Sequence, residues 1–323
     1  MFLPGLCAAC LAVALGNGSD AALLSTWQGR GIALRYTPDG RYVVARDGLG
    51  VTIFDALRGT IVGTSTVVKH ADMVYEPMGM DVSHDGRLVV YVTNGELVMA
   101  QIPLGKTVHV KSTRLPSGAV AFSPDGATLV LDNGVLQVYS SSDLELELQR
   151  VDAGNHATNA ASFSPDGRTL ASAGYGTEIY LWDVRTWSLK DTLTGHPTYI
   201  SSVTFSRDGR FLASGGGGKT IIVWDVATGH PLWRRDFDEC CPRYCLALSP
   251  DGRWLVTSNK SEAIVLDARK GTIALKWDTR DKDGVRSAAF SPDGRRLVTS
   301  GFYNVIRLWD FDRLMARAKA QSK

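Results

Sequence analysis

Short runs of alternating apolar and polar residues, separated by glycine-containing turns, make up most of the chain. Residues 162–184 show the pattern most clearly and read SFSPDGRTLASAGYGTEIYLWDV. Two turns, at residues 165–167 and 174–178, separate three short strands in this segment. Apolar and small residues alternate between the turns, which is the period-two pattern of a pleated strand. The pattern therefore predicts short strands joined by tight turns.

The first turn of this segment recurs along the chain at a nearly constant spacing. The seven copies are TPDG, SHDG, SPDG, SPDG, SRDG, SPDG and SPDG, and they begin at Thr37, Ser83, Ser123, Ser164, Ser206, Ser249 and Ser291. Successive copies lie 40 to 46 residues apart. A repeat of this length with several short strands is typical of a β-propeller blade of four antiparallel strands. Seven copies predict seven blades.

The third strand of most repeats ends in a bulky apolar residue followed by Asp. These endings are Phe54-Asp55, Trp182-Asp183, Trp224-Asp225, Leu266-Asp267 and Trp309-Asp310, with Ala100-Gln101 and Tyr139-Ser140 in degraded form. His196, preceded by Gly, lies ten residues before Ser206. With these motifs the chain resembles the WD-repeat family over roughly residues 27–311. The resemblance implies an all-β fold, a seven-bladed β-propeller of four-stranded antiparallel sheets.

The resemblance also implies a buried hydrogen-bond relay of His, Ser or Thr, Trp and Asp inside a blade. Blade five offers His196, Ser214 and Trp224, but its second turn, residues 215–219, contains no Asp. We therefore expect only part of the family's relay, as a structural relay of these three side chains.

A strand from the start of the repeats is expected to close the ring. The last repeat has three strands within residues 285–309 and no fourth, whereas residues 22–27 form a lone strand without a turn motif. An open blade edge would be free to pair with another chain. In propellers of the WD-repeat family the first strand commonly completes the last blade. We therefore expect residues 23–27 to pair with the strand that contains Arg307.

Length, composition and charge fit one propeller with short terminal segments. We expect an apolar leader or signal peptide over residues 1–21, the propeller over residues 22–311, and a short basic tail over residues 312–323. The tail resembles a solvated helix capped by Asp312, with a docking peptide as the alternative. The chain has 35 basic and 33 acidic residues, well mixed along its length, and a net charge of +2. This balance gives no argument for nucleic acid or an anionic membrane as the main partner.

The N-terminal segment leaves the localisation open. Residues 2–16 are almost wholly apolar, a length that suits a signal peptide and falls short of the ~20 residues of a membrane-spanning helix. No Lys or Arg precedes this run, so a buried or disordered tail and a misplaced start codon remain alternatives. Export to the periplasm or the outside is favoured, with a cytoplasmic location as the alternative. No later segment has the length and hydrophobicity for a transmembrane span.

The innermost strands can be aligned by counting back from each turn motif. Four residues before it stand only small residues, namely Ala33, Gly79, Ala119, Ala160, Ser202, Cys245 and Ser287, as expected where seven strands crowd around an axis. Two residues before the motif, blades one and two carry Arg35 and Asp81. We expect Arg35 and Asp81 to form an ion pair near the channel. A ligand or ion site in the channel is the alternative, because an unpaired buried charge is costly.

The cysteines do not form a recognisable metal-binding framework. They are Cys7, Cys10, Cys240, Cys241 and Cys245, of which the last three form the segment ECCPRYC. Cys245 holds a small-residue position and is expected to be a core thiol. Free thiols are the preferred interpretation of the cluster. A disulfide, or a zinc or copper site with the nearby His230, stays open. We expect no metal and no cofactor.

Surface recognition is the chemistry that remains. Loops that lead into the innermost strands should gather around one mouth of the channel, and there the alignment places Arg30, Glu76, Tyr199, Arg243, Tyr244 and Arg286. Tyr and Arg are enriched among the residues that dominate interface energies. We therefore expect these residues to bind a partner, with ordinary rim residues as the alternative.

The sequence predicts a non-catalytic scaffold that binds other proteins or peptides through the propeller face and the channel mouth. No HExxH pair, GxSxG elbow, P-loop or dinucleotide fingerprint is present. A lactonase-like propeller hydrolase and a channel ligand-binding protein are the alternatives, and a structural module of an envelope complex is a third. Several convergent carboxylates or His in the channel would favour the hydrolase, whereas the alignment places one acid and one base there.

Overall fold

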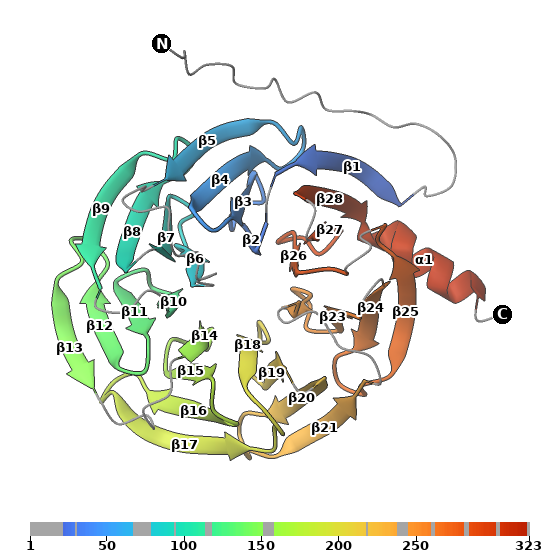
Figure 1. Cartoon of the computed structure of the whole chain (residues 1–323). Helices are drawn as coiled ribbons and strands as arrows, with labels where there is room; N and C mark the ends of the chain where they lie inside the picture. Colours follow the sequence, from blue (N-terminus) through green and yellow to red (C-terminus); the bar gives the residue numbers. More distant parts are fainter. Residues whose placement is uncertain are drawn as a thin grey trace, which may run out of the picture.

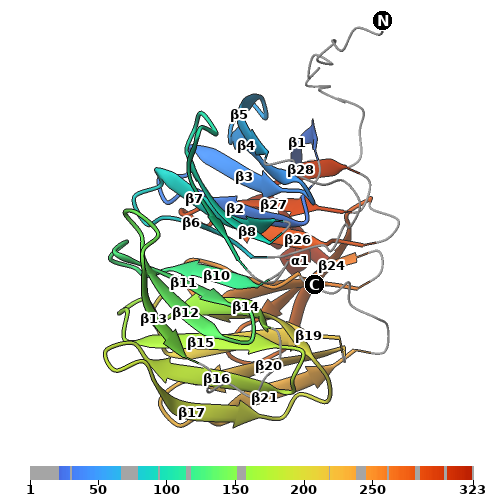
Figure 2. The same cartoon turned by 60° about the vertical axis from the view of Figure 1, so that its left-hand side comes forward.

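Seven four-stranded antiparallel sheets surround a central axis in the computed structural model of the chain (Figure 1). The structure describes residues 22–29, 31–66, 79–93, 95–113, 118–150, 158–217, 219–237, 245–259, 262–280, 284–301 and 304–321. The leader predicted over residues 1–21 lies outside them. In the turned view of Figure 2 the sheets follow one another around the disc as the blades of a propeller. The predicted fold class, a seven-bladed β-propeller, is confirmed.

In blades one to six the strands follow one another along the chain from the axis to the rim. The strands of blades one to three are β2 (Ala33–Tyr36), β3 (Tyr42–Arg46), β4 (Gly50–Asp55) and β5 (Ile61–Thr66); β6 (Met80–Val82), β7 (Leu88–Thr93), β8 (Glu96–Gln101) and β9 (Thr107–Ser112); β10 (Ala119–Phe122), β11 (Thr128–Asp132), β12 (Leu136–Ser140) and β13 (Leu146–Arg150). Those of blades four to six are β14 (Thr158–Phe163), β15 (Thr169–Gly174), β16 (Glu178–Asp183) and β17 (Ser188–Thr194); β18 (Ile200–Phe205), β19 (Phe211–Gly216), β20 (Thr220–Asp225) and β21 (Pro231–Asp236); β22 (Ala247–Leu248), β23 (Trp254–Ser258), β24 (Glu262–Asp267) and β25 (Ile273–Asp278). Blade seven has β26 (Ser287–Phe290), β27 (Arg296–Ser300), β28 (Val305–Asp310) and, at its rim, β1 (Leu23–Gln28).

Blade seven is assembled from both ends of the propeller. β1 pairs antiparallel with β28 and places Thr26 opposite Arg307, which confirms the predicted closure by the N-terminal strand. Trp27 of β1 is 2% exposed and stacks on Phe54 of blade one, with the ring centroids 5.6 Å apart. β1 therefore joins blade seven through its backbone and blade one through its largest side chain.

The hydrophobic core is divided among the interfaces between neighbouring blades. One cluster joins Val43 and Phe54 of blade one to Val298 and Ile306 of blade seven, and similar clusters fill the other interfaces. The Trp residues of the three Trp-Asp endings, Trp182, Trp224 and Trp309, are at most 1% exposed. Because each sheet buries its faces only against its neighbours, the blades depend on one another for stability.

The C-terminal helix α1 (Phe311–Gln321) is docked against the ring. Phe311 and Leu314 are 3% and 1% exposed and belong to a core cluster shared by blades six and seven. The ring of Phe311 meets that of Phe290 edge to face, with the centroids 4.8 Å apart. The expectation of a solvated helix is therefore wrong, because one face of α1 is apolar and covers the end of this core.

The N-cap of α1 is Asp310, the Asp that ends the last Trp-Asp motif. Its Oδ1 accepts a hydrogen bond from the backbone N–H of Arg313 at 3.0 Å. This is the geometry by which a capping carboxylate satisfies an N–H of the first turn. The predicted cap, Asp312, lies inside the helix and is exposed, so that part of the prediction is wrong.

Candidate functional site

The two faces of the ring carry different parts of each blade. Because the innermost strands β2, β6, β10, β14, β18, β22 and β26 occupy equivalent places in their sheets, they all run in one direction along the axis. The loops that lead into them, among them the one with Tyr199, lie on what we call the loop face. The seven TPDG, SPDG, SHDG and SRDG turns that follow them lie on the opposite face, which we call the turn face.

Each turn of the turn face is held in the same way by its own side chains. The hydroxyl of its first residue donates to Oδ1 of its Asp at 2.5–2.6 Å in all seven turns, for example Ser164 to Asp166. In the same turn, the Ser164 hydroxyl also accepts the backbone N–H of Thr169 at 2.9 Å. The Ser164 hydroxyl is the main cause that holds the pKa of Asp166 below its usual value. The same hydroxyl–carboxylate hydrogen bond therefore fixes the shape of each turn.

A cavity of about 680 Å³ occupies the channel along the axis. Small residues of the aligned ring line it, namely Ala33, Gly79, Ala119, Ala160, Ser202 and Ser287. Cys245, the seventh member, is 5% exposed and packs in the core cluster of blades six and seven. At this level of the channel six blades present small side chains, which leaves open space on the axis.

Arg35 and Asp81 lie side by side in the channel wall. Nε of Arg35 is 3.9 Å from Oδ1 of Asp81, and Nη1 of Arg35 donates to the carbonyl of Leu34 at 3.0 Å. Oδ2 of Asp81 accepts the backbone N–H of Phe122 in blade three at 2.9 Å. Burial raises the pKa of Asp81, while the Arg35 charge and the Phe122 N–H lower it. Asp81 therefore ties blades one, two and three together around the axis.

The three relay residues of blade five lie within hydrogen-bond distance of one another. Ser214 Oγ is 2.7 Å from His196 Nε2 and accepts a hydrogen bond from Trp224 Nε1 at 2.8 Å. His196 is 6% exposed, and burial lowers its pKa to about 4, with the charge of Arg234 acting in the same direction. The imidazole is therefore neutral near pH 7 and serves as a structural group.

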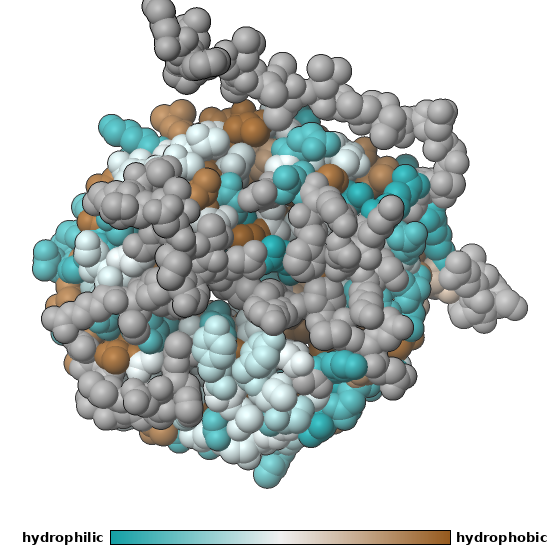
Figure 3. All heavy atoms as spheres, in the orientation of Figure 1, coloured by the Kyte–Doolittle hydropathy of each residue, from teal (hydrophilic) through white to brown (hydrophobic). Residues whose placement is uncertain are grey.

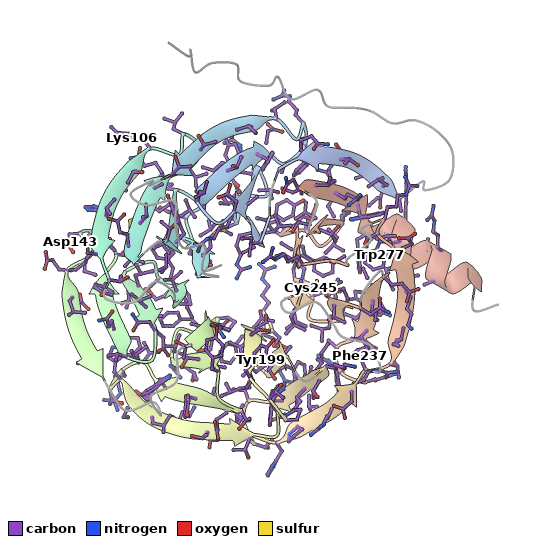
Figure 4. The ribbon with its side chains drawn as sticks, in the orientation of Figure 1. Lys106, Asp143, Tyr199, Phe237, Cys245 and Trp277 are labelled. Carbon is purple, nitrogen blue, oxygen red and sulfur yellow. The ribbon has the colours of Figure 1, made fainter. Side chains whose placement is uncertain are left out.

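The loop face presents an exposed tyrosine, Tyr175, beside a half-buried one, Tyr199, at the boundary of blades four and five. Tyr175, in the turn between β15 and β16, is 64% exposed, and its ring centroid lies 6.2 Å from that of Tyr199, which precedes β18. A Cβ added to Gly217 would lie 2.1 Å from Cε1 of Tyr199, so the Tyr199 ring lies directly over the backbone of the β19–β20 turn. Figure 4 places Tyr199 beside β18, toward the centre of the ring.

The other predicted partner-binding residues do not join this pair in the described part of the chain. Arg286 precedes β26, but its side chain is only 9% exposed, and burial lowers its pKa. Its guanidinium is therefore packed into the wall and does not form part of an exposed rim. Four predicted residues lie outside the described residues, namely Arg30, Glu76, Arg243 and Tyr244. Cys240 and Cys241 lie outside them as well.

Three segments of the chain match the family model of the WD domain, G-beta repeat, at residues 148–183, 187–225 and 276–310. The chain contains WD repeats and folds as a seven-bladed β-propeller. No curated protein matches it. Each matched segment begins within the rim strand of one blade, or one residue before it, and ends at the Trp-Asp motif of the next, at Asp183, Asp225 or Asp310.

The matched blades of this WD-repeat propeller are those in which a buried Trp is hydrogen bonded to a hydroxyl of the second strand. Trp182 Nε1 donates to Ser172 Oγ at 3.0 Å, and Trp309 Nε1 donates to Thr299 Oγ1 at 2.9 Å. These two bonds are equivalent to the Trp224–Ser214 bond of blade five. The pattern Ser or Thr ten residues before Trp is visible in the sequence and would have identified the blade-seven pair.

Blades one and two are joined by a buried Arg that sequence reasoning did not single out. Arg46 at the end of β3 is 0% exposed and donates to the backbone carbonyls of Gly79 and Val92 in blade two. Its guanidinium lies 5.7 Å from the ring centroid of Tyr91. Burial lowers the pKa of Arg46 to about 10. The side chain remains charged near neutral pH and links the end of β3 to the backbone of blade two.

Few acidic or imidazole side chains gather in the described part of the channel. Within the described ranges no group of three or more His, Cys, Asp or Glu side chains is placed to hold a metal ion. Along the described channel wall one carboxylate, Asp81, and one imidazole, His84, line the cavity. Among the described residues no helix has the length and hydrophobicity to cross a membrane.

Proposed function

We propose that this WD-repeat propeller is a non-catalytic scaffold that binds a partner protein or peptide on the loop face, through Tyr175 and Tyr199. WD-repeat propellers are typically protein-interaction scaffolds and are mostly non-catalytic. The observation that carries the proposal is the ring contact between exposed Tyr175 and half-buried Tyr199 on the loop face. Tyr offers a large apolar ring with a polar end and is enriched among interface hot spots.

The surroundings of the pair support this role. The second strands of blades four and five end in glycines, and residues 215–217 run beneath Tyr199 without side chains. In Figure 3 the sector over β14–β21, at the bottom of the view, is pale, which marks residues of intermediate hydropathy such as Tyr, Gly, Thr and Ser. A partner segment can therefore approach the tyrosine rings without displacing strongly hydrated charges.

The test is affinity capture from the native source with the wild-type protein and with Tyr175→Ala combined with Tyr199→Ala. Because a hot-spot residue contributes about 2 kcal/mol or more, we expect the double variant to bind a specifically captured partner roughly thirtyfold more weakly or worse. The matched control is Leu57→Ala combined with Leu104→Ala. These two leucines are 67% and 69% exposed in third-to-fourth-strand turns, on the turn-face side of the ring. Equal capture by both double variants, with unchanged thermal unfolding, would overturn the proposal.

A further inference from the structure

The seven turns of the turn face form a ring in which a proline of one blade packs against the glycine of the next. A Cβ added to Gly86 would lie 3.3 Å from Pro38, and one added to Gly209 would lie 3.5 Å from Pro165. The same arrangement pairs Gly167 with Pro124, Gly294 with Pro250, and Gly40 with Pro292, at 3.4–3.7 Å. The prolines thus fill the space between neighbouring turns around the mouth of the channel.

Two turns break this ring because they carry a polar residue in place of proline. The second residue of the turn is His84 in blade two and Arg207 in blade five. The following glycines lose their neighbour: a Cβ added to Gly126 would meet nothing within 4 Å, and one added to Gly252 would meet only Ser206, at 3.9 Å. Both replacing side chains line the channel cavity.

These replacements bring a histidine and an arginine into a cavity whose other lining residues, apart from Arg35 and Asp81, are uncharged. Its strongly ionisable lining groups are Arg35, Asp81, His84 and Arg207. Arg207 makes no hydrogen bond or ion pair with any described residue, whereas Asp81 is already engaged by Arg35 and the N–H of Phe122. The cavity lining therefore carries two guanidiniums and one carboxylate, and side chains with nitrogen-bearing ends reach into the central opening (Figure 4).

We propose that the turn-face mouth of the channel binds a small phosphate-bearing anion between Arg207 and Arg35. A guanidinium binds a phosphate through two parallel hydrogen bonds, and the tetrahedral oxygens of a phosphate can accept donors from several directions at once. Blades one, two and five supply Arg35, His84 and Arg207 from different sides of the axis. The hydroxyls of Ser162 and Thr204 are further donors in the wall, and Asp81 can accept a protonated phosphate oxygen or a neighbouring hydroxyl.

This site is separate from the proposed partner surface. Tyr199 precedes β18 and Arg207 follows it, so the two lie at opposite ends of the same innermost strand. The phosphate-bearing anion therefore binds on the axis at the turn face, and its binding does not depend on the loop-face scaffold function.

The test measures binding of pyrophosphate and orthophosphate to the full chain by isothermal titration calorimetry and by thermal unfolding. We expect saturable binding and a rise in Tm for the wild type, and an increase in Kd of about tenfold or more for Arg207→Gln, because the charged hydrogen bonds are lost. The matched control is Arg210→Gln, three residues later in the same chain segment, where the guanidinium lies 5.9 Å from the ring centroid of Phe211. Arg210→Gln should bind pyrophosphate as the wild type does.

One further variant and two control ions test whether the site is specific for phosphate. Arg207→Lys retains the charge but not the planar pair of donors, so its Kd should fall between those of the wild type and Arg207→Gln. Sodium chloride at equal ionic strength and citrate should raise Tm less than pyrophosphate does. Equal binding by Arg207→Gln, or an equal effect of sodium chloride or citrate, would overturn the assignment of a phosphate site at Arg207.

Discussion

At the residue scale, the side chain of Ser214 is the common hydrogen-bond partner of two buried side chains in blade five. Its hydroxyl lies 2.7 Å from His196 Nε2 and 2.8 Å from Trp224 Nε1, and all three side chains are buried. Replacing Ser214 by Ala leaves two buried polar atoms without that partner. An unsatisfied buried group costs about 1–3 kcal/mol, so we expect Ser214→Ala to lower Tm by several degrees in calorimetry.

The control for Ser214→Ala is Thr299→Val in blade seven. Thr299 accepts only the indole N–H of Trp309, at 2.9 Å, and Val preserves the shape of the side chain. Its effect should be clearly smaller, because one polar group and not two loses its partner. If both variants lower Tm equally, the shared role of Ser214 is contradicted.

His196 gives the fold a defined pH dependence. Its pKa is lowered from 6.5 to about 4 by burial. As the pH falls from 6.5 toward 4, the unfolded chain takes up a proton that the folded state excludes, so stability is lost across this window, by up to about 3 kcal/mol. Asp166 and Asp293, with pKa values below the usual 3.8, titrate below this window.

The measurement compares thermal unfolding of the wild type and His196→Asn at pH 7 and at pH 4.5. Asn can still exchange a hydrogen bond with Ser214 but does not titrate. We expect the variant to be the less stable protein at pH 7 and the difference in Tm to narrow at pH 4.5. A difference in Tm that is the same at both pH values would show that His196 does not couple folding to protonation.

At the element scale, the described strands follow from local sequence, because each turn motif carries its own hydrogen bonds and each strand its own alternation. The end of the chain does not follow in the same way. The Asp of the last Trp-Asp motif, Asp310, caps α1, so one residue serves both a strand end and a helix start. The docking of Phe311 and Leu314 depends on an apolar opening between blades six and seven, which exists only after the ring has formed.

Closure by β1 makes a direct prediction for a truncated chain. Removing residues 1–28 deletes the rim strand of blade seven and the Trp27–Phe54 stack, whereas removing residues 1–21 leaves both in place. Because an unpaired strand edge and an exposed apolar cluster result, the longer deletion should lower Tm and promote aggregation. Light scattering during thermal unfolding measures both effects. Equal behaviour of the two truncated chains would mean that β1 does not hold the ring closed.

Docking of α1 is tested by Leu314→Ala. Leu314 is 1% exposed in the shared core of blades six and seven, and Leu→Ala at such a site costs about 2–5 kcal/mol. Asp312→Ala, on the exposed side of the first turn, is the control and should change stability little, because Asp310 is the cap. Differential scanning calorimetry of the two variants distinguishes a docked helix from a solvated one. A solvated helix would tolerate both changes.

At the scale of the whole molecule, the features that sequence reasoning missed are those created between blades. Arg46 looks like an ordinary strand end until β3 is placed beside the carbonyls of Gly79 and Val92. Tyr175 lies in a different blade from Tyr199. Their aromatic side chains meet only because the two blades are neighbours in the propeller. Arg286 was expected on the rim because its loop leads to the mouth, but the direction of its side chain depends on the neighbouring blades. A repeat pattern identifies equivalent positions and cannot show what lies across an interface.

The ring of turns yields a prediction that concerns the whole propeller. The seven turn glycines share a φ between 66° and 74°, so the turn of blade five has the backbone of the turns that carry proline. The N–H of Arg207 makes no hydrogen bond to the described residues. Arg207→Pro therefore suits the existing backbone and restores the packing against Gly252. We expect a gain of about 0.4–1 kcal/mol, mostly because the unfolded chain becomes more restricted.

The same variant removes the guanidinium from the channel, so it separates stability from ligand binding. Arg207→Pro should unfold at a Tm roughly 1–3 °C above that of the wild type and lose the further rise that pyrophosphate produces. His84→Pro, which would restore the packing against Gly126, is the companion variant and should also raise Tm. A destabilised Arg207→Pro protein would show that Arg207 is a structural residue of the turn. A stabilised protein that still binds pyrophosphate would place the anion elsewhere. We expect higher stability together with lost pyrophosphate binding. That result would show that Arg207 binds the anion at a position where proline would stabilise the turn more.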